Sequence, residues 1–455
     1  MSRHVAVIGA GFAGLAAAVR LADAGARVTV LERRGVLGGR AYSFREPESG
    51  AVVDNGQHLF MRCYGETLAF LGRLGTADRI AFEPRLDVAF VGEGGAAARL
   101  TCPALPAPLH VLAGLLRFGG VRARDRLALV RGGVALAAAA RGGGAAEAAL
   151  EPLTVASWLA RHGQTPGARR VFWDPLTLAT LNDAPEVASA RWLLAVARRA
   201  FFGGSRAGDL GVAAVGLSDL YTEQARAIVE AAGGRVRTHA AAASLEVAGD
   251  RVVAVRLSAA GRGAGERLPV DAVVAAVPHR VLPSLLPPAL AARPPFAGLA
   301  RLGASPIVSF HLWYDRPVAP RPFVGLLGSP LHWLFDRGTH VTAVTSGARD
   351  LVGRPHTELV ALAEREVARL VPAARGARLL RGHVVKEPFA TPSLAPGAAS
   401  LRPGTATPLA NLVLAGDWTD TGLPGTIEGA VQSGHAAAAA LAGAPAGAAV
   451  EATGA

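Results

Sequence analysis

The stretch DNGQHLFM, residues 54–61, places polar side chains directly before three apolar ones. Asp54 and His58 are four residues apart and can serve as a proton donor and its partner carboxylate. The apolar residues 59–61 can form the wall of a binding site. A polar cluster beside an apolar wall suits a place where a polar cofactor meets an apolar substrate. The alternative is that Asp54 and Asn55 hold the backbone and that His58 is a hydrogen-bonded core residue.

Three glycines near the N-terminus have the spacing of a phosphate-binding turn. Gly9, Gly11 and Gly14 lie between an apolar, strand-like run and a helix-like run. The first glycine allows a tight turn, the second a close approach of pyrophosphate, and the third close packing of helix on strand. Free N–H groups and the helix dipole favour an anion there. Glu32 ends the next strand-like run, where a carboxylate can bind ribose hydroxyls.

A second glycine pair follows this βαβ pattern. Gly38 and Gly39 have no side chains and leave the backbone accessible, and Arg40 adds a cation that can bind phosphate. A simple NAD enzyme has no need of this pair. The order GxGxxG, then Glu32 and Arg33, then GGR resembles the FAD-binding start of the amine oxidase and phytoene desaturase superfamily.

The segment GDWTDTGLPGTIEGAVQSG, residues 416–434, resembles the second flavin motif of that superfamily. By this resemblance, Gly416 and Asp417 bind the ribityl or pyrophosphate region. Thr426 and Ile427 open a helix whose N-terminus faces the flavin pyrimidine ring. The dipole of that helix would stabilise negative charge on reduced flavin.

Further cofactor contacts follow from the same resemblance. It implies that the backbone of Val236, in GGRVRTH, reads the adenine. We also expect Gly56 and Gln57 to contact the cofactor. The sequence predicts no metal site.

Three stretches resemble the hydroxysqualene dehydroxylase family: DNGQHLFMRCYGETLAFLGRLG, FWDPLTLATLNDAP and DWTDTGLPGTIEGAVQSGH. The resemblance covers nearly the whole chain. It implies that reduced FAD and hydroxysqualene give squalene, FAD and water, in bacterial squalene and hopanoid biosynthesis. Because hydroxide is a poor leaving group, an acid is required; we assign His58 as that acid and Asp54 as its orienting partner. The weaker candidates are Trp173, Asp174, Asn182 and Asp183, although a helix cap explains Asp183 equally well.

Three other functions remain open at this stage. A carotenoid or isoprenoid desaturase would move hydride in the opposite direction with the same geometry. Amine oxidases of the superfamily place a lysine near the flavin; the block ASPIVSFHLWYDRP has none, and the only lysine is Lys386. A prenyl-chain-binding protein would use the fold without redox chemistry, but it would not need both flavin motifs.

The order of the elements predicts an α/β fold. We expect a discontinuous FAD-binding, Rossmann-like domain of the glutathione reductase type, with an inserted α+β substrate domain. Residues 141–150 are interpreted as an Ala/Gly-rich linker. The predicted ranges are 1–85, 225–285 and 405–442 for the FAD-binding domain, 86–224 and 286–404 for the substrate domain, and 443–455 for a disordered tail.

Composition and charge limit the partners. Apolar residues make up 51% of the 455-residue chain and its formal net charge is +12. No nucleic-acid module is visible, so a membrane surface is the better partner for this charge. Residues 105–130 are apolar with intermittent arginine, and form either a membrane-surface helix pair or helices packed on the core. No apolar run is long enough to span a bilayer.

These features together predict a cytoplasmic protein at the inner face of the cell membrane. Two cysteines without CxxC spacing, Cys63 and Cys102, fit a reducing compartment. No second GxGxxG motif is present, so the sequence does not name the electron donor that would reduce the flavin.

Overall fold

The computed structural model describes residues 3–95, 97–258, 265–338 and 340–443. The predicted disordered tail, 443–455, lies outside the described residues except for its first residue.

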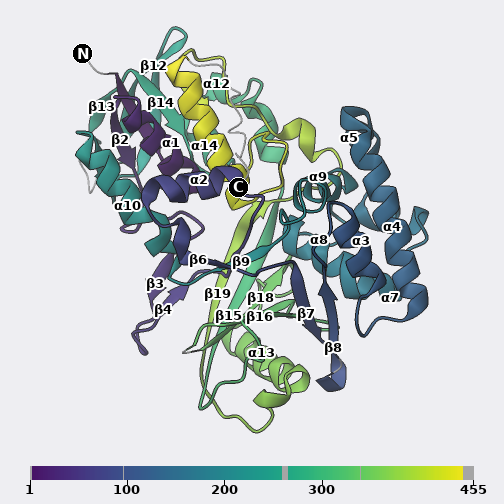
Figure 1. Ribbon diagram of the computed structural model, residues 1–455. Coiled ribbons are helices and arrows are strands. Elements are labelled where there is room, and N and C mark those ends of the chain that lie inside the picture. Colours follow the sequence, from purple (N-terminus) through teal and green to yellow (C-terminus); the bar gives the residue numbers. More distant parts are fainter. Residues whose placement is uncertain (1–2, 96, 259–264, 339, 444–455) are drawn as a thin grey trace.

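A five-stranded parallel sheet gathers strands from the start, the middle and the end of the chain (Figure 1). Four of its strands are short runs rich in valine, alanine, leucine and isoleucine, the composition of strands that are buried on both faces, and the edge strand β10 is Arg-Val-Arg. In sheet order they are β10 (Arg235–Arg237), β2 (Arg27–Leu31), β1 (His4–Ile8), β14 (Ala272–Ala275) and β20 (Leu412–Leu414).

Different elements cover the two faces of this sheet. Val5 and Val7 of β1 pack in one core with the helices α1 (Phe12–Asp23), α2 (Gly65–Leu74), α10 (Leu217–Ala231) and α14 (Ile427–Ala442). Ala6 and Ile8 face a second core. That core is formed with β11 (Ala242–Ala248), β12 (Arg251–Leu257), β13 (Arg267–Pro269), α11 (Leu282–Leu285) and α12 (Pro288–Ala291). The predicted α/β fold and the expected paired strands within residues 233–257 are confirmed.

A seven-stranded sheet forms the lower part of the molecule in Figure 1. On one of its faces, Val308, Phe310 and Leu312 pack with α13 (His356–Leu370). In sheet order the strands are β19 (Leu379–Pro392), β15 (Ala304–Tyr314), β18 (Val341–Ser346), β17 (Trp333–Asp336), β16 (Phe323–Leu326), β7 (Asp87–Val91) and β8 (Ala97–Thr101).

A block of helices lies beside this sheet, on the right in Figure 1. Its members are α3 (Leu109–Leu116), α4 (Ala123–Arg141), α5 (Gly143–Leu150), α6 (Val155–Arg161), α7 (Pro166–Ala168), a π-helical turn (Arg169–Trp173), α8 (Asp174–Leu181) and α9 (Ala190–Ala200). The interpretation of residues 141–150 as a linker was wrong. The alanines favour a helix, and Glu147 anchors it through an ion pair to Arg198 of α9.

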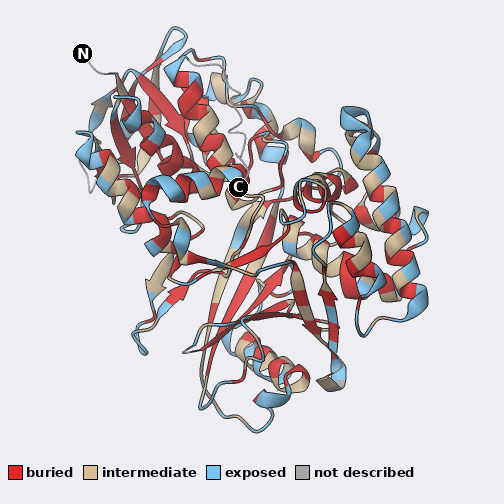
Figure 2. Ribbon diagram, viewed as in Figure 1, coloured by how far each residue is buried: buried red, intermediate tan, exposed pale blue. Residues whose placement is uncertain are grey.

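Small elements join these parts. They are the pair β3 (Ser43–Arg45) and β4 (Val52–Asp54), the sheet β5 (Leu59–Met61), β9 (Leu210–Ala213) and β6 (Ile80–Phe82), and the 3₁₀ turns Ala77–Arg79, Glu93–Gly95, Phe296–Arg301, Pro372–Ala374 and Ala398–Leu401. Figure 2 shows buried residues running through both sheets and the inner sides of the helices.

The predicted domain boundaries stay a prediction. Helix α10 extends across the expected boundary at 224/225, and Leu217 and Leu220 at its start pack in the same core as β1. Among the described residues, no helix combines the length and apolarity needed to cross a membrane.

Candidate active site and cofactor-binding site

The turn between β1 and α1 has room only for glycine. A Cβ atom at Gly9, where φ is +105°, would lie 2.5 Å from the carbonyl oxygen of Ala276. A Cβ atom at Gly14 would lie 1.9 Å from the carbonyl oxygen of Gly9. Gly11 is the N-cap of α1 and provides no side-chain cap, so the helix begins with bare backbone. This is the local geometry that binds pyrophosphate.

The second glycine motif lies directly against the first. Gly38 donates a 2.8 Å backbone hydrogen bond to Ala10. A Cβ atom at Gly39 would come within 3.0 Å of the Cα atom of Gly11. The two loops therefore form a backbone cradle next to the start of α1, and any larger side chain would fill it. The residues present fit a dinucleotide diphosphate.

Glu32 is buried at the end of β2 beside this cradle. Its carboxylate accepts hydrogen bonds from the backbone N–H groups of Ala10 (3.1 Å) and Arg34 (2.9 Å). Val236 pairs with Val30 of β2, on the edge strand β10. The structure thus brings the predicted ribose-binding carboxylate and the predicted adenine-reading strand together.

Arg33 and Arg34 behave differently. Arg33 is exposed. Arg34 donates to the carbonyl oxygen of Gly39, and its guanidinium lies 4.6 Å from the ring centre of Tyr42. The sequence interpretation did not include Arg34. Alternation of side-chain directions along an extended segment is the signal that places Arg34 on the same side as Glu32.

Arg40 and Asp417, from opposite ends of the chain, form an ion pair. Arg40 also donates a 2.7 Å hydrogen bond to the carbonyl oxygen of Ala390. Burial opposes the charge on Arg40, but Asp417 outweighs it and holds the pKa of Arg40 above its ordinary value. The N–H of Gly416 donates to the hydroxyl of Ser433 at 2.7 Å. The ion pair between Arg40 and Asp417 therefore joins the GGR motif to the C-terminal motif.

The C-terminal motif, residues 416–434, contains the start of α14, and that helix opens at Thr426 and Ile427 as predicted. Thr426 is the N-cap, its hydroxyl accepts a 3.1 Å hydrogen bond from the N–H of Gly429, and Ile427 is the first helical residue. Glu428 is buried and accepts hydrogen bonds from the N–H groups of Glu66 (3.1 Å) and Thr67 (2.9 Å) at the start of α2. Burial raises the pKa of Glu428. No local sequence pattern predicts this connection between the starts of α14 and α2.

Asp54 is buried, and its carboxylate is already engaged by several donors. Oδ1 accepts from the hydroxyl of Ser43 at 2.7 Å and from the N–H of Leu217 at 2.9 Å. Oδ2 accepts from Gln57 at 3.2 Å and lies 3.5 Å from the guanidinium of Arg337. Asp54 thus holds the start of α10 against β3. These are the contacts that the backbone-holding alternative predicts.

Asn55 ties the same segment to the second glycine motif. Its amide nitrogen donates a 2.6 Å hydrogen bond to the carbonyl oxygen of Arg40, and its amide oxygen accepts from the N–H of Tyr42 at 3.2 Å. The stretch that begins at Asp54 is therefore fixed to the predicted FAD loop. Asn55 was not among the predicted site residues.

His58 is oriented by its own segment. Its Nδ1 atom lies 2.9 Å from the carbonyl oxygen of Gly56, and no hydrogen bond joins it to Asp54 in the described part of the chain. The expected orienting role of Asp54 is therefore taken by the Gly56 carbonyl. Burial lowers the pKa of His58; Gly56 and Asp54 raise it, and Arg40 lowers it further, with a net lowering.

Ser309 on β15 is the residue that the sequence interpretation missed near this loop. A Cβ atom at Gly56 would lie 3.4 Å from the Ser309 hydroxyl, which is buried and has no hydrogen-bond partner among the described residues. Lys386 on β19 is the strand partner of Val308, which precedes Ser309 on β15. The Lys386 side chain donates a hydrogen bond to the carbonyl oxygen of Arg354. The single lysine is thus directed to another part of the molecule.

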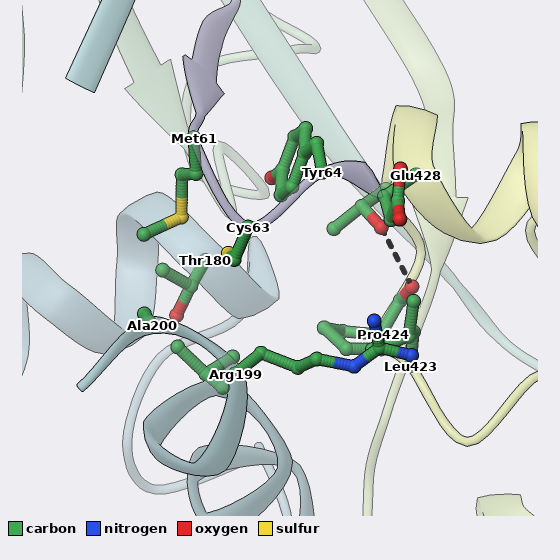
Figure 3. Close-up of a pocket in the computed structure, with 11 residues that line it drawn as sticks. Met61, Cys63, Tyr64, Thr180, Arg199, Ala200, Leu423, Pro424 and Glu428 are labelled. Atoms are coloured by element: carbon green, nitrogen blue, oxygen red, sulfur yellow. Dashed lines mark hydrogen bonds between the residues drawn. The ribbon is translucent and has the colours of Figure 1, made fainter. Parts of the chain in front are cut away.

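A mainly apolar pocket lies where the start of α14 meets α9 and the residues after β5 (Figure 3). Met61, Val196 and Leu423 contribute apolar walls, and Thr426 and Glu428 contribute the polar end. Met61 belongs to the predicted apolar wall, so that wall and the predicted flavin-facing helix border one pocket. The neighbouring Phe60 is instead fully buried in the core of the parallel sheet.

Each of the weaker candidates is engaged in structural contacts, Trp173 and Asp174 within the helical block, and Asn182 and Asp183 between that block and other segments. Trp173 donates to the side chain of Gln164 at 2.7 Å, and Asp174 pairs with Arg169. The other contacts are those of Asn182 with Ser305, Thr391 and Gly347, and of Asp183 with Arg349, Ser393 and Leu394. The C-cap of α8 is Asn182, and Asp183 follows it outside the helix.

The sequence matches the family described as flavin containing amine oxidoreductase over residues 12–442. The chain belongs to this family. Hydroxysqualene dehydroxylase from Rhodopseudomonas palustris is 33% identical over 96% of this chain and 98% of its own length. Hydroxysqualene dehydroxylase from Sinorhizobium fredii is 31% identical with the same coverage. The 15-cis-phytoene desaturase of Synechococcus elongatus is 28% identical over 96% of this chain and 95% of its own length.

Solved structures of two amine oxidases share the fold. A putrescine oxidase variant superimposes with a TM-score of 0.73 at 18% identity, covering 96% of this chain and 98% of its own. Cyclohexylamine oxidase from Brevibacterium oxydans gives 0.67 at 20% identity, covering 97% and 99%. The predicted FAD-binding fold and the resemblance to hydroxysqualene dehydroxylases are thereby confirmed.

Membership of the flavin containing amine oxidoreductases settles two further predictions. The cofactor is FAD, in keeping with the backbone cradle and with Glu32 beside it. The protein is an FAD-dependent oxidoreductase, so the reading as a non-catalytic prenyl-binding protein is set aside. The roles of individual residues are taken up as proposals below.

Proposed function

We propose that this enzyme reduces hydroxysqualene to squalene in bacterial squalene and hopanoid biosynthesis. The reaction consumes reduced FAD and hydroxysqualene and yields FAD, squalene and water. The observation that carries the proposal is the nearly full-length similarity to two hydroxysqualene dehydroxylases. The apolar pocket at the start of α14 supports it, because an isoprenoid chain needs such a surface.

The cofactor would be held by residues from three parts of the chain. Reduced FAD supplies a hydride when bound. The residues proposed to hold FAD are Gly9, Gly11, Gly14, Glu32, Arg33, Gly38, Gly39, Arg40, Gly56, Gln57, Val236, Gly416, Asp417, Thr426 and Ile427, and Arg34 joins them. The start of α14 provides the positive end of a helix dipole, which favours negative charge nearby.

The proton needed to release water is proposed to come from His58. Its Nδ1–H is directed to the Gly56 carbonyl, which leaves Nε2 to donate once the ring is protonated. Asp54 acts through its charge and by fixing the loop, and the carbonyl of Gly56 orients the ring.

A membrane surface is proposed as the source of the substrate, with the enzyme in the cytoplasm at the inner face of the membrane. Leu116 is 55% exposed at the end of α3 and Leu127 is 64% exposed on α4. Leu109 and Val134 are also exposed, each seven residues from one of these on the same helix. Exposed arginines lie among them, at 117, 122, 124 and 131. Apolar side chains ringed by arginine suit an anionic lipid surface.

The first experiment is an anaerobic single turnover. The purified holoprotein is reduced with dithionite and mixed with hydroxysqualene, and the lipid extract is analysed by mass spectrometry while flavin absorbance is followed. Squalene formed in step with flavin oxidation is the expected result. Reduced flavin that stays reduced, with hydroxysqualene unchanged, would overturn the proposal.

A desaturase is the second candidate, and the similarity to 15-cis-phytoene desaturase favours it. The same protein in its oxidised state would then be mixed with phytoene. Flavin reduction with a desaturated product would identify this activity. An amine oxidase is disfavoured, because the single lysine is directed elsewhere.

A further inference from the structure

A second apolar pocket lies on the other side of the C-terminal end of α9. It is formed between α3, α4 and the π-helical turn, and its walls include Val111, Leu115, Leu136, Phe172 and Phe202. Among the residues that the structure describes, no charged side chain lines it. Of the site candidates described above, Trp173 lines this pocket.

Consecutive residues line first one pocket and then the other. Arg199 and Ala200 line the pocket at the start of α14, as Figure 3 shows. Phe201 and Phe202, which follow directly, line the second pocket. Ala200 and Phe201 are buried in one apolar cluster, and Met61 and Phe202 pack against that same cluster. Phe201 and Phe202, called the partition below, thus follow the wall of the first pocket in the chain, line the second pocket and belong to the same apolar cluster.

The backbone around the partition is fixed on the side of the first pocket. Cys63, which lines that pocket, donates a 2.9 Å hydrogen bond to the carbonyl oxygen of Ala207. The N–H of Phe202 bonds to Ala197 at 3.1 Å. A Cβ atom at Gly203 would lie 2.7 Å from the carbonyl oxygen of Arg199, so the chain can turn there only at a glycine. With the backbone held, rotation of the phenylalanine side chains is the least costly way to join the pockets.

We propose that the two pockets are the two halves of one passage for the isoprenoid chain, and that Phe201 and Phe202 form the partition that must move to open it. The inference rests on the proposed function. Helix α3 supports this occupant: Val111 and Leu115 face the second pocket, while Leu109 and Leu116 of the same helix are exposed. One helix thus borders both the pocket and the proposed lipid-facing surface, so a hydrocarbon chain can leave lipid without crossing water.

The passage is tested by filling the second pocket. Ala137 lines it, whereas the adjacent Ala138 is exposed and does not. Binding of squalene and of the shorter isoprenoid farnesol to the oxidised holoprotein is measured through flavin fluorescence. Ala137→Trp is expected to weaken squalene binding about tenfold or more, because overpacking blocks the chain. Farnesol, a shorter chain expected to need only the first pocket, should bind within about twofold of wild type, and Ala138→Trp should change the binding of neither ligand.

The partition is tested by kinetics. Phe202→Ala should speed squalene association in stopped-flow mixing, and Phe202→Trp should slow it, with unchanged FAD content. Unaltered squalene affinity in Ala137→Trp together with unaltered association rates in the Phe202 variants would overturn the passage. These readouts need no turnover. A protein that binds squalene but does not convert hydroxysqualene to squalene would refute the proposed reaction and leave the passage standing. A wild-type protein that binds no squalene would refute the passage.

Discussion

His58 is the single side chain on which the proposed chemistry depends most. It must be protonated to donate, yet its surroundings lower its pKa, chiefly through burial. The protonated, proton-donating form of His58 therefore becomes the major form only at a pH below the ordinary histidine pKa of about 6.5. Turnover by the reduced enzyme should rise as the pH falls toward the acidic side of that value.

His58→Ala should lower the rate of squalene formation by about 10²-fold or more, the usual contribution of a general acid. The FAD content and the flavin spectrum should not change, because no predicted FAD contact is removed. Single-turnover rates measured across pH check both effects, since the variant should also lose the acidic rise. If His58→Gln retained the wild-type rate and profile, the proton donor would be another group.

The site residues that could be predicted from the sequence are those whose roles depend on local backbone. Gly9 and Gly14 belong to a turn whose sterics are set within a few residues, and Glu32 ends the strand that follows. Ser309 and Glu428 could not be found in this way. Each contacts a segment hundreds of residues away, and no local pattern encodes that meeting.

At the scale of elements, the start of α14 positions the proposed flavin-facing dipole. Thr426 supplies its cap through the N–H of Gly429. Thr426→Val removes the acceptor at nearly constant volume and should cost about 1 kcal/mol of stability. FAD affinity should weaken as well, since the helix end frays beside the cofactor. Thermal unfolding and FAD titration check this, with Thr426→Ser as the control that keeps the hydroxyl.

A result in which Thr426→Val unfolds at the wild-type temperature and binds FAD normally would show that other contacts hold this helix start. The carboxylate of Glu428, which accepts hydrogen bonds from the start of α2, is one of these contacts. A Thr426→Val/Glu428→Gln double variant then measures how far the two contacts substitute for one another.

The exposed leucines on α3 and α4 allow a test of the proposed membrane contact. Leu116→Gln/Leu127→Gln should reduce sedimentation with anionic liposomes at low salt by about tenfold or more, because each leucine loses its apolar burial in lipid. Leu380→Gln is the matched control, since Leu380 is 55% exposed on β19, in the large sheet. Equal binding of all three proteins would refute this surface.

The order of strands in the large sheet was beyond prediction from the sequence, although several of its strands read as apolar runs. β16 pairs with β7 through Gly325 and Phe90, which are far apart in the chain. A Cβ atom at Gly325 would lie 2.3 Å from the Phe90 ring, so the pairing depends on a tertiary fit. The βαβ start was predictable because its parallel strands are joined through a single helix.

At the scale of the whole molecule, buried histidines make stability depend on pH. Burial lowers the pKa of His332 and of His340 to about 4, and that of His311 well below its ordinary value. The unfolded chain therefore binds more protons than the folded one below about pH 6.5. The stabilisation is fully present above that pH and is lost progressively as the pH falls toward 4.

The melting temperature should consequently fall between about pH 7 and about pH 5, and His332 offers the sharpest test. Its Nδ1 atom accepts a 3.1 Å hydrogen bond from the N–H of Ser346, which protonation would remove. His332→Asn keeps an acceptor that cannot titrate, so the fall should be shallower in this variant. His239→Asn is the control, because His239 is exposed and its left-handed backbone suits asparagine. A pH dependence identical in wild type and His332→Asn would assign the acid sensitivity to other groups.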